Sequence, residues 1–265
     1  MPTPSARPPK PLTVSIVSHG QLELVRPLLE QLDRLCHAVI DKVVLTINIP
    51  EDLSLAARPL AHLEVQILEN PAPMGFGANH NQAFGHCATP WFLVLNPDIR
   101  LDSDVLSPLI AHAQPEGGLL APRILEPGKP TPEQHRAIIT PLEIVTRKRP
   151  GYVRPAVPEW IPGLFMLFRS EAYRQIEGFD ERFFMYGEDF DICARLRLAG
   201  WTLQIAEDLT ARHDARRASH RSKRHLYWHV TSLLKVWSST AFWRYWRMAR
   251  GNDVRPPRTD RARRP

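Results

Sequence analysis

The sequence predicts an α/β fold in which helices cover a mostly parallel β-sheet. Three observations support that class: β-branched apolar runs typical of strands, apolar residues at helical spacing, and a regular alternation of the two. Strands that alternate with helices are joined by crossover connections, which make neighbouring strands parallel. Ligands of such sheets bind at the carboxyl ends of the strands, so the residues that follow each strand are the first candidates for a site.

The first half of the chain supplies this alternation. LTVSIVS at 12–18 is the first expected strand, and the segment after it carries Leu24, Leu28, Leu32 and Leu35 at helical spacing. Further strands are expected at 43–50, 63–70 and 91–98, and further helices at 74–87 and 104–113. One layered domain therefore begins close to the N-terminus.

The second half is less regular. Residues 121–158 are rich in proline and predict an irregular connection, whereas 160–173 predicts a strand that runs into a helix. A long helical pattern, rich in aromatic residues and arginine, begins at about residue 222. We therefore expect four regions, namely a disordered N-terminus at 1–11, a layered domain at 12–225, a helical extension at 226–250 and a disordered basic tail at 251–265.

Composition indicates a cytoplasmic protein. The chain has 265 residues, of which 43% are hydrophobic, enough for a sizeable core. Its three cysteines are far apart and lack metal-ligand spacing, which indicates reduced thiols. The N-terminal MPTPSARPPKP lacks the apolar core of a signal peptide, and no apolar run reaches the ~20 residues of a membrane span.

Charge is distributed unevenly along the chain. Residues 211–265 contain 15 Lys and Arg but 3 Asp and Glu, a net charge of +12, whereas residues 1–210 carry −6. A basic tail on an acidic body indicates an anionic partner. Its aromatic and arginine pattern is typical of an anionic membrane surface, which predicts a peripheral position on the inner face of the cell membrane. A helix that packs these rings on the domain or on a second subunit explains the pattern equally well, and the oligomeric state is open.

Two residues are candidate metal ligands. Asp98 follows the apolar strand in VLNPDIR at 94–100, where a carboxylate suits Mg²⁺ or Mn²⁺ bound to a phosphate. Asn-Pro-Asp is also ordinary turn chemistry at the end of a strand. His213 lies in a basic run with several hydroxyls, where it is either a ligand or a solvated surface residue.

The glycine-containing segment 69–85 is a candidate phosphate-binding loop. It opens a predicted helix with Asn79, His80 and Asn81. Glycine permits close backbone approach, and a helix N-terminus offers free N–H groups to an anion. An ordinary glycine turn with an asparagine cap gives the same pattern.

The acidic segment FFMYGEDFDICARLRLAGW at 183–201 carries the strongest chemical signal. Glu188, Asp189 and Asp191 stand at the start of a helical pattern, directly after bulky aromatic residues. An apolar wall beside clustered carboxylates raises their pKa, which suits a general base. The structural alternative is a helix start in which Asp191 pairs with Arg195.

Taken in this order, the motifs resemble family 2 glycosyltransferases, which have the GT-A fold. The similarity spans roughly residues 12–225, and its most specific portion is EWIPGLFMLFRSEAYRQIEGFDERFFMYGEDFDICARLRLAGW at 159–201. That portion is similar to the rhamnosyltransferase-type branch, which builds bacterial surface polysaccharides. The resemblance implies inverting transfer of a sugar, such as rhamnose, from a nucleotide-diphosphate sugar to a glycan or lipid-linked acceptor. It also implies Mg²⁺ or Mn²⁺ as cofactor. The acidic body and the carboxylate cluster argue against nucleic acid as a partner of the whole chain.

The resemblance assigns roles to individual residues. Asp189 matches the catalytic base, with Glu188 beside it, and Asp98 and His213 match the metal site. The donor-binding positions are Val17, Ser18, His19, Asn48, Gly77, Asn79, Asn81, Asn96 and Asp98. The acceptor-binding positions are Trp160, Gly163 and Tyr186.

Three positions depart from the family pattern. Asn96 stands at the first position of the DxD-like motif, Asn48 replaces an aspartate-asparagine pair, and His19-Gly20 replaces a common Tyr-Asn pair. These departures leave the nucleobase and the sugar open. The alternatives are a catalytically weak homologue that binds a nucleotide sugar and a nucleic-acid-binding protein that uses the basic tail. A sugar nucleotidyltransferase is disfavoured, because HGQLELV lacks a glycine-rich triphosphate loop.

Overall fold

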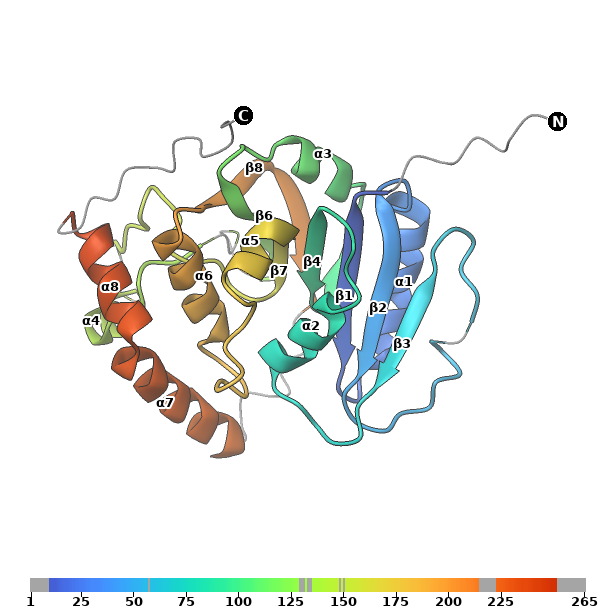
Figure 1. Cartoon of the computed structure of the whole chain (residues 1–265), viewed down its shortest axis with the longest axis horizontal. Coiled ribbons are helices and arrows are strands. Elements are labelled where there is room, and N and C mark those ends of the chain that lie inside the picture. Colours follow the sequence, from blue (N-terminus) through green and yellow to red (C-terminus); the bar gives the residue numbers. More distant parts are fainter. Residues whose placement is uncertain are drawn as a thin grey trace, which may run out of the picture.

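A single eight-stranded sheet organises the computed structural model, which describes residues 10–56, 58–128, 132, 135–147, 149, 151–214 and 223–251 (Figure 1). The strand order is β3-β2-β1-β4-β7-β6-β8-β5. The strands are β1 (Leu12–Ser18), β2 (Ile40–Ile47), β3 (Val65–Glu69), β4 (Trp91–Leu95), β5 (Ile99–Arg100), β6 (Gly117–Leu125), β7 (Phe165–Arg169) and β8 (Thr202–His213). The helices are α1 (Leu22–Leu35), α2 (Phe76–Phe84), α3 (Leu106–Ala111), α4 (Pro141–Thr146), α5 (Ser170–Gln175), α6 (Glu188–Leu198), α7 (Lys223–Ser238) and α8 (Thr240–Ala249).

The sheet is parallel in its first half and mixed in its second. β3, β2, β1 and β4 are parallel neighbours, as the alternation of strands and helices predicts. β7 then runs antiparallel to both β4 and β6, and β5 runs antiparallel to β8. Because β7 is antiparallel to β4, the carboxyl end of β4 at Leu95 lies beside the start of β7 at Phe165.

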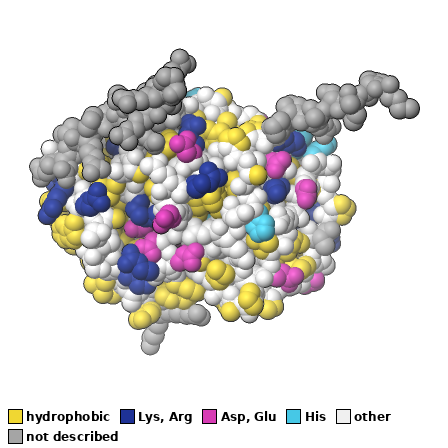
Figure 2. All heavy atoms as spheres, in the orientation of Figure 1, with side chains coloured by type: hydrophobic (Ala, Val, Ile, Leu, Met, Phe, Trp, Pro, Cys, Tyr) yellow, Lys and Arg dark blue, Asp and Glu magenta, His cyan; other side chains and the backbone are white. Residues whose placement is uncertain are grey.

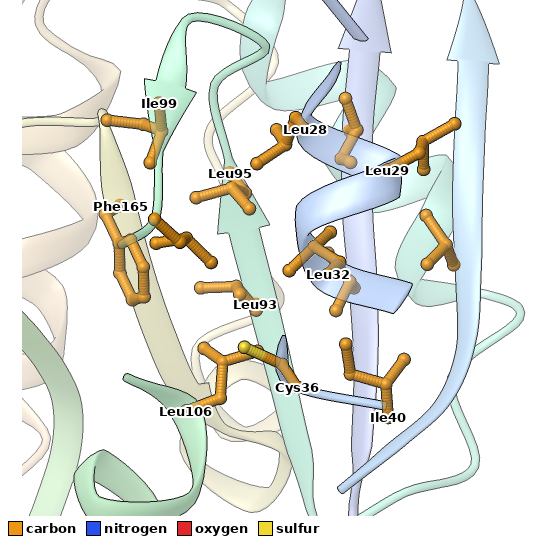
Figure 3. Close-up of a cluster of buried hydrophobic side chains, with 14 of the residues drawn as sticks. Leu28, Leu29, Leu32, Cys36, Ile40, Leu93, Leu95, Ile99, Leu106 and Phe165 are labelled. Atoms are coloured by element: carbon orange, nitrogen blue, oxygen red, sulfur yellow. The ribbon is translucent and has the colours of Figure 1, made fainter. Parts of the chain in front are cut away.

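Alternating side chains of the central strands build two apolar cores, one on each face of the sheet. In β4, Leu93 and Leu95 point to one face, whereas Phe92 and Val94 point to the other. The first face is covered by α1 and α3 (Figure 3). The second is covered by α2, α5 and α6, and α8 packs against α6 on the side away from the sheet. Burial on both faces explains why WFLVL contains no polar residue.

The expectation of an irregular connection at 121–158 is wrong for two stretches. The end of β6 occupies 121–125, and α4 occupies 141–146. Pro122 cannot donate a ladder hydrogen bond, and the register of β6 against β8 shifts between Pro122 and Arg123. Local sequence therefore conceals a strand that tertiary pairing stabilises. β8 and the two-residue β5 were not expected either.

The helical pattern that begins at about residue 222 is two helices. α7 ends at Ser238, and Ser239 caps α8 by accepting a hydrogen bond from the N–H of Phe242 at 3.1 Å. Residues 1–9 and 252–265 lie outside the described residues, so disorder at both termini stays a prediction. In the part of the chain described here, no helix is long and apolar enough to cross a membrane.

The aromatic rings of α8 pack inward. Phe242 and Tyr245 are buried, and both contact Phe190 of α6, with ring centroids 5.8 and 6.3 Å apart. The Tyr245 hydroxyl donates to the carbonyl of Glu159 at 2.6 Å, and the indole N–H of Trp237 donates to the carbonyl of Ile139 at 2.8 Å. Of the two explanations for the aromatic pattern, packing on the domain holds for these rings.

Candidate active site

The acidic pair stands at the N-terminus of α6. Two residues with positive φ, Tyr186 at 71° and Gly187 at 86°, turn the chain directly before Glu188. Asp189 Oδ1 accepts a hydrogen bond from the N–H of Phe190 at 2.8 Å, and Oδ2 accepts one from the N–H of Gly163 at 3.3 Å. The Asp189 carboxylate is thus oriented by two backbone groups from different segments.

Burial governs the protonation of this pair. It raises the pKa of Asp189, while the charge of Arg136 and hydrogen bonds from Phe190 and Gly163 oppose the rise. It also raises the pKa of Glu188, and the adjacent Asp189 charge adds to the effect. Glu188 Oε2 is buried without a hydrogen-bond partner among the described residues. Carboxylates with a raised pKa bind a proton more readily, as a general base must.

Glu188→Gln is expected to raise thermal stability at neutral pH. Because the pKa of Glu188 is raised in the folded protein, the unfolded chain releases its proton first, and the free energy of unfolding falls as the pH rises above about 4.3. The glutamine variant lacks this dependence. Melting curves from mildly acid to mildly alkaline pH should show an advantage for the variant that grows with pH; an advantage independent of pH would contradict the assignment.

Asp98 and His213 meet at the other candidate centre. β5 pairs with the end of β8, which sets Ile99 opposite His213. His213 Nε2 lies 3.0 Å from Asp98 Oδ2, and His213 Nδ1 lies 3.3 Å from Glu126 Oε1. Burial lowers the pKa of His213, but hydrogen bonds to Asp98 and Glu126 and their charges outweigh it, so the pKa is raised. His213 is therefore a partner of Asp98 and not a solvated surface residue.

The donor atoms at Asp98 and His213 suit a divalent cation. Asp98 Oδ1 is buried and has no hydrogen-bond partner in the described ranges, so its lone pairs are available to an ion. Glu126 holds the second ring nitrogen of His213, an arrangement that orients histidine ligands. Within the described residues, no group of three or more His, Cys, Asp or Glu side chains is arranged to hold a metal. The described residues therefore offer two ligands at this centre, and Mg²⁺ or Mn²⁺ would need further oxygens, such as those of a phosphate.

One short segment connects the two centres. The N–H of Asn96 donates to the carbonyl of Leu164 at 3.0 Å, and the N–H of the preceding residue, Gly163, donates to Asp189 at 3.3 Å. This contact follows from the antiparallel pairing of β4 and β7, which brings the turn after β4 to the segment before β7. The turn that carries Asn96 and Asp98 is therefore linked to Asp189 through Leu164 and Gly163.

Arg136 is a basic residue of this site that the sequence analysis did not select. Its backbone pairs with that of Trp160, and its guanidinium carbon lies 5.1 Å from the centre of the Trp160 ring. Burial lowers the pKa of Arg136, and the negative charges of Asp189 and Glu126 raise it. Since Glu126 contacts His213, Arg136 is influenced by both centres. It lies in the proline-rich stretch, where no local pattern marks it.

The expected donor-binding residues at the strand ends include a histidine with a defined hydrogen-bond partner. His19 is exposed, and its Nδ1 lies 3.1 Å from Asn48 Nδ2. The Asn48 amide is oriented by the backbone of Met74, since its Oδ1 accepts from the Met74 N–H at 2.8 Å and its Nδ2 donates to the Met74 carbonyl at 3.0 Å. Nδ1 of a neutral His19 must then accept, which leaves the proton on Nε2.

The hydroxyl of Ser18 is hydrogen-bonded to Glu51, a residue that the sequence pattern did not single out. This hydroxyl donates to Glu51 at 2.7 Å, and the same carboxylate accepts from the N–H groups of Gly20 and Leu22 at 2.8 and 3.0 Å. Glu51 thus caps the start of α1. Val17 is half-buried in β1. Among the three expected donor-binding residues at the end of this strand, His19 is therefore the exposed one.

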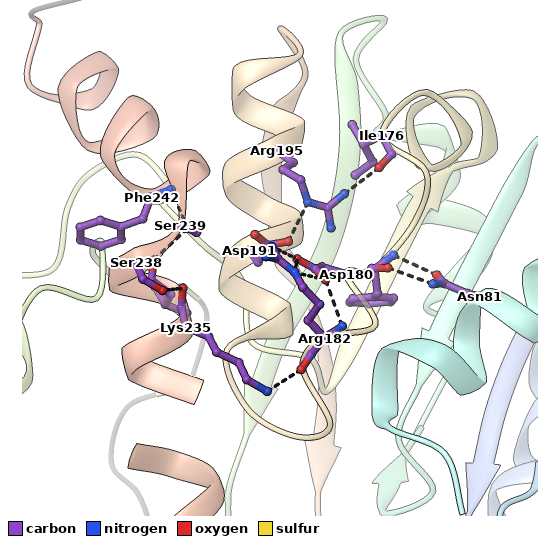
Figure 4. Close-up of polar contacts among 12 residues, drawn as sticks. Asn81, Ile176, Asp180, Arg182, Asp191, Arg195, Lys235, Ser238, Ser239 and Phe242 are labelled. Carbon is purple, nitrogen blue, oxygen red and sulfur yellow. Dashed lines mark hydrogen bonds and ion pairs between the residues drawn. The ribbon is translucent and has the colours of Figure 1, made fainter. Parts of the chain in front are cut away.

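Two of the expected donor-binding asparagines make structural hydrogen bonds. Asn79 is buried, and its side chain accepts a hydrogen bond from the side-chain amide of Asn70 at 2.6 Å. The same Asn70 amide also donates to Asn48 at 2.9 Å. Asn81 contacts the segment before α6 (Figure 4), where it donates to the carbonyl of Phe179 and accepts from its N–H, both at 2.9 Å. A donor-binding role for Asn79 and Asn81 stays a prediction, and their side chains hold the loop and α2 in place.

The helix salt bridge expected in α6 is present. Arg195 Nε lies 2.6 Å from Asp191 Oδ2, and Arg195 Nη1 donates to the carbonyl of Ile176 at 2.7 Å (Figure 4). Burial raises the pKa of Asp191, although the Arg195 charge opposes the rise. Of the three acidic residues at the helix start, Asp191 therefore has a structural partner, whereas Asp189 faces Gly163.

Gly77→Ala is expected to destabilise the protein by about 1–3 kcal/mol, because overpacking forces side chains out of position. A Cβ at Gly77 would lie 2.5 Å from Cβ of Phe179, so this glycine lets α2 approach the segment before α6. Gly163→Ala is the matched control, since its new methyl group would lie no closer than 3.4 Å to any neighbour. Thermal denaturation of both variants measures the difference; equal melting temperatures would contradict it.

The three expected acceptor-binding residues lie at one end of the site. Trp160 is buried and donates its indole N–H to the carbonyl of Ala137 at 2.7 Å. Gly163 contacts Asp189, and the Tyr186 ring stacks on His229 of α7 at 3.5 Å between centroids. Trp160 supports the site from below the surface, so Gly163 and Tyr186 are the two that adjoin the carboxylates.

The fold is that of the GT-A glycosyltransferases. Mannosyltransferase PcManGT from Pyrobaculum calidifontis, solved with GDP-Man and Mn²⁺, superposes with a TM-score of 0.60 at 15% identity, covering 97% of this chain and 79% of that one. GalNAc-T7, solved with UDP, GalNAc and Mn²⁺, superposes with a TM-score of 0.64 at 15% identity, covering 95% of this chain and 52% of that one.

The chain belongs to glycosyl transferase family group 2, whose model matches residues 91–251. Rhamnosyltransferase WbbL of Escherichia coli K12 is 26% identical over 247 residues, covering 84% of this chain and 90% of the relative. Pre-mycofactocin glycosyltransferase of Mycobacterium tuberculosis is 31% identical over 159 residues, which cover 59% of this chain. The match spans 33% of that relative's length.

Proposed function

We propose that the protein transfers a sugar, with inversion, from a nucleotide-diphosphate sugar to an acceptor hydroxyl. The observation that carries this proposal is the link between the two centres, in which Asn96 bonds to Leu164 and Gly163 bonds to Asp189. This link connects Asp98 and His213, which could bind the cation of a diphosphate, with Asp189, whose carboxylate could act as the base. The metal would be Mg²⁺ or Mn²⁺, held by Asp98 and His213.

The chemistry of the chain's own residues supports a single displacement. Asp189 would accept the proton of the acceptor hydroxyl while that oxygen attacks the anomeric carbon from the face opposite the nucleotide. Gly163 and Phe190 donate to the Asp189 carboxylate and hold it in place. A cation bound at Asp98 and His213 would supply charge stabilisation for the departing nucleoside diphosphate. Attack from the opposite face inverts the configuration at the anomeric carbon.

The relatives support the class of substrate. One of them is named a rhamnosyltransferase, and another, 28% identical over 199 residues, is N-acetylglucosaminyl-diphospho-decaprenol L-rhamnosyltransferase of Mycobacterium tuberculosis. We therefore propose rhamnose as the sugar and a lipid-linked glycan as the acceptor, in the synthesis of cell-surface polysaccharide. Such an acceptor places the protein at the cytoplasmic face of the membrane.

His19 supports a preference among nucleobases. Its orientation by Asn48 leaves an N–H on Nε2, and that donor suits a base carbonyl. Uracil, thymine and guanine carry a carbonyl, whereas adenine does not. We propose that donors with one of those three bases bind more tightly than an adenine donor.

A screen of nucleotide-diphosphate sugars tests the proposal. Thermal shifts should identify a uridine, thymidine or guanosine donor whose effect requires Mn²⁺, with ADP-glucose as the control that gives none. The donor so identified should then lose its sugar to water or to acceptor, with release of the nucleoside diphosphate. Failure of every donor to stabilise the protein, with or without Mn²⁺, would overturn the proposal.

A catalytically weak homologue is the second candidate, and Asn96 is the observation that favours it. Its amide replaces a charged ligand of the DxD-like motif, which weakens cation binding. A protein of this kind would bind the donor in the screen and release no nucleoside diphosphate, so the two readouts separate the candidates.

Arg136→Gln is expected to move the acid limb of the pH–activity profile to higher pH. The Arg136 charge lowers the pKa of Asp189 against the effect of burial, and the base must be deprotonated to act. Without that charge, the base becomes deprotonated only at higher pH. Arg136→Lys keeps the charge and should shift the profile less. A kcat/KM profile of Arg136→Gln that superposes on that of the wild type would contradict this role.

A further inference from the structure

The helix α7 exposes an apolar stripe. Tyr227, Val230 and Leu234 recur at spacings of three and four residues, and they are 66%, 49% and 59% exposed. Ser232 and Val236, which lie on the opposite side of the helix, are buried against the domain. Since α7 already packs through its other side, the stripe is not needed to hold the helix in place.

A second exposed apolar pair lies on the neighbouring helix. Leu142 and Val145 of α4 are 72% and 58% exposed. α4 starts two residues after Ile139, whose carbonyl accepts the indole N–H of Trp237 from α7, so the two helices are neighbours. These five side chains define what we call the outer apolar face. Clusters of this kind on a surface mark sites of interaction.

The sequence of α7 and α8 carries charge of one sign, whereas α4 contains one acidic residue, Glu143. Residues 223–251 contain Lys223, Arg224, Lys235, Arg244, Arg247 and Arg250 and no Asp or Glu. Arg147 and Arg149 follow α4 directly. Basic and apolar side chains lie side by side at the end of the molecule formed by α7 and α8 (Figure 2). A partner that is both apolar and anionic matches this combination, whereas a protein surface would need acidic side chains placed around its own apolar patch.

The inner side of α7 contacts the segment that leads to Asp189. Ser232 donates to the carbonyl of Met185 at 2.9 Å, and Lys235 donates to that of Arg182 at 2.5 Å. The ring of His229 stacks on Tyr186, three residues before the proposed base. Whatever binds the outer apolar face is therefore separated from the acceptor end of the site by the thickness of one helix, about 10 Å.

We propose that the outer apolar face docks on an anionic lipid bilayer, with Tyr227, Val230 and Leu234 inserted at the level of the head groups. This assignment differs from the expectation that the rings of 228–250 insert, because Phe242 and Tyr245 are buried in the domain. Docking in this way places the acceptor end of the site beside the membrane. The link between docking and a lipid-linked acceptor rests on the proposed function. Docking of the face on a bilayer does not depend on that function.

Flotation with vesicles tests the docking. The full chain should float at low salt with vesicles of phosphatidylcholine and phosphatidylglycerol, and hardly at all with phosphatidylcholine alone. Val230→Ser with Leu234→Ser should weaken binding by about tenfold or more, since each buried aliphatic side chain contributes to membrane affinity. Val230→Ile with Leu234→Met keeps the positions apolar and should bind as the wild type does.

A matched pair of variants tests the electrostatic part. Arg244→Gln with Arg247→Gln removes two exposed charges of α8, the helix that follows α7, and should weaken binding by about thirtyfold. Arg34→Gln with Arg58→Gln makes the same change in net charge on the side of α1, at the opposite end of the molecule (Figure 1), and should leave binding nearly unchanged. Equal losses in the two pairs would show attraction by net charge only and would overturn the proposal.

Two further outcomes would overturn it. One is failure of the wild type to float with anionic vesicles. The other is a dimer in sedimentation velocity that Val230→Ser with Leu234→Ser dissociates, which would assign the face to a second copy of the chain. The affinity for Mn²⁺ alone can be measured by the loss of the EPR signal of the free ion. It should be the same in the wild type and in the variant with Val230→Ser and Leu234→Ser. A failure of docking is thereby distinguished from a failure of the proposed function.

Discussion

Asp189→Asn is expected to lower turnover by about 10²–10⁴-fold while leaving the binding of donor and metal nearly unchanged. Asparagine keeps the size of the side chain and can still accept one of the two hydrogen bonds that Gly163 and Phe190 donate to the separate oxygens of Asp189. It cannot accept the proton of the acceptor hydroxyl. The loss should therefore appear in kcat and kcat/KM alike, as expected for an interaction that acts only in the transition state.

Asp191→Asn is the matched control for that prediction. It lies on the same helix and is buried, but its carboxylate pairs with Arg195. Its loss should lower the melting temperature and leave kcat within a few-fold of the wild-type value. Turnover of Asp189→Asn close to that of the wild type, or an equal loss in both variants, would show that Asp189 is not the base.

Asp98→Ala is expected to abolish most of the metal dependence of donor binding. Asp98 supplies one of the two candidate ligands and also hydrogen-bonds the other, His213, at 3.0 Å. The substitution removes a ligand and leaves His213 with Glu126 as its remaining acidic partner. A weakening of Mn²⁺ binding by about 10–100-fold or more is expected, because loss even of an orienting partner has an effect of that size.

Asp102→Ala provides the control for charge. Asp102 is exposed and pairs with Arg212 at 2.9 Å, four residues along the chain from Asp98. Both variants lose one negative charge, and titration calorimetry with Mn²⁺ in the presence and absence of the donor should separate them. Unchanged Mn²⁺ binding in Asp98→Ala would show that Asp98 is not a metal ligand. The role of Asp189 would not be affected, because Asp189→Asn tests it separately.

The donor loop illustrates the limit of sequence patterns. Gly77, Asn79 and Asn81 look like a phosphate cradle because glycine and asparagine at a helix start have that use in many proteins. In the structure, a Cβ at Gly77 would meet Phe179, and Asn81 binds both backbone groups of that residue. The same residue types serve close packing between segments about 100 positions apart, and no local pattern distinguishes the two uses.

Local pattern was enough to predict the parallel strands β1 to β4, the carboxylates at the start of α6 and the Asp191–Arg195 pair, because each depends on neighbours a few residues away. Glu126, Arg136 and Glu51 escaped prediction, since their roles arise from contacts with distant segments. Whether the aromatic residues of α8 face lipid or core also depended on tertiary packing. A helix shows in its sequence which side is apolar, and only the completed fold shows which side is covered.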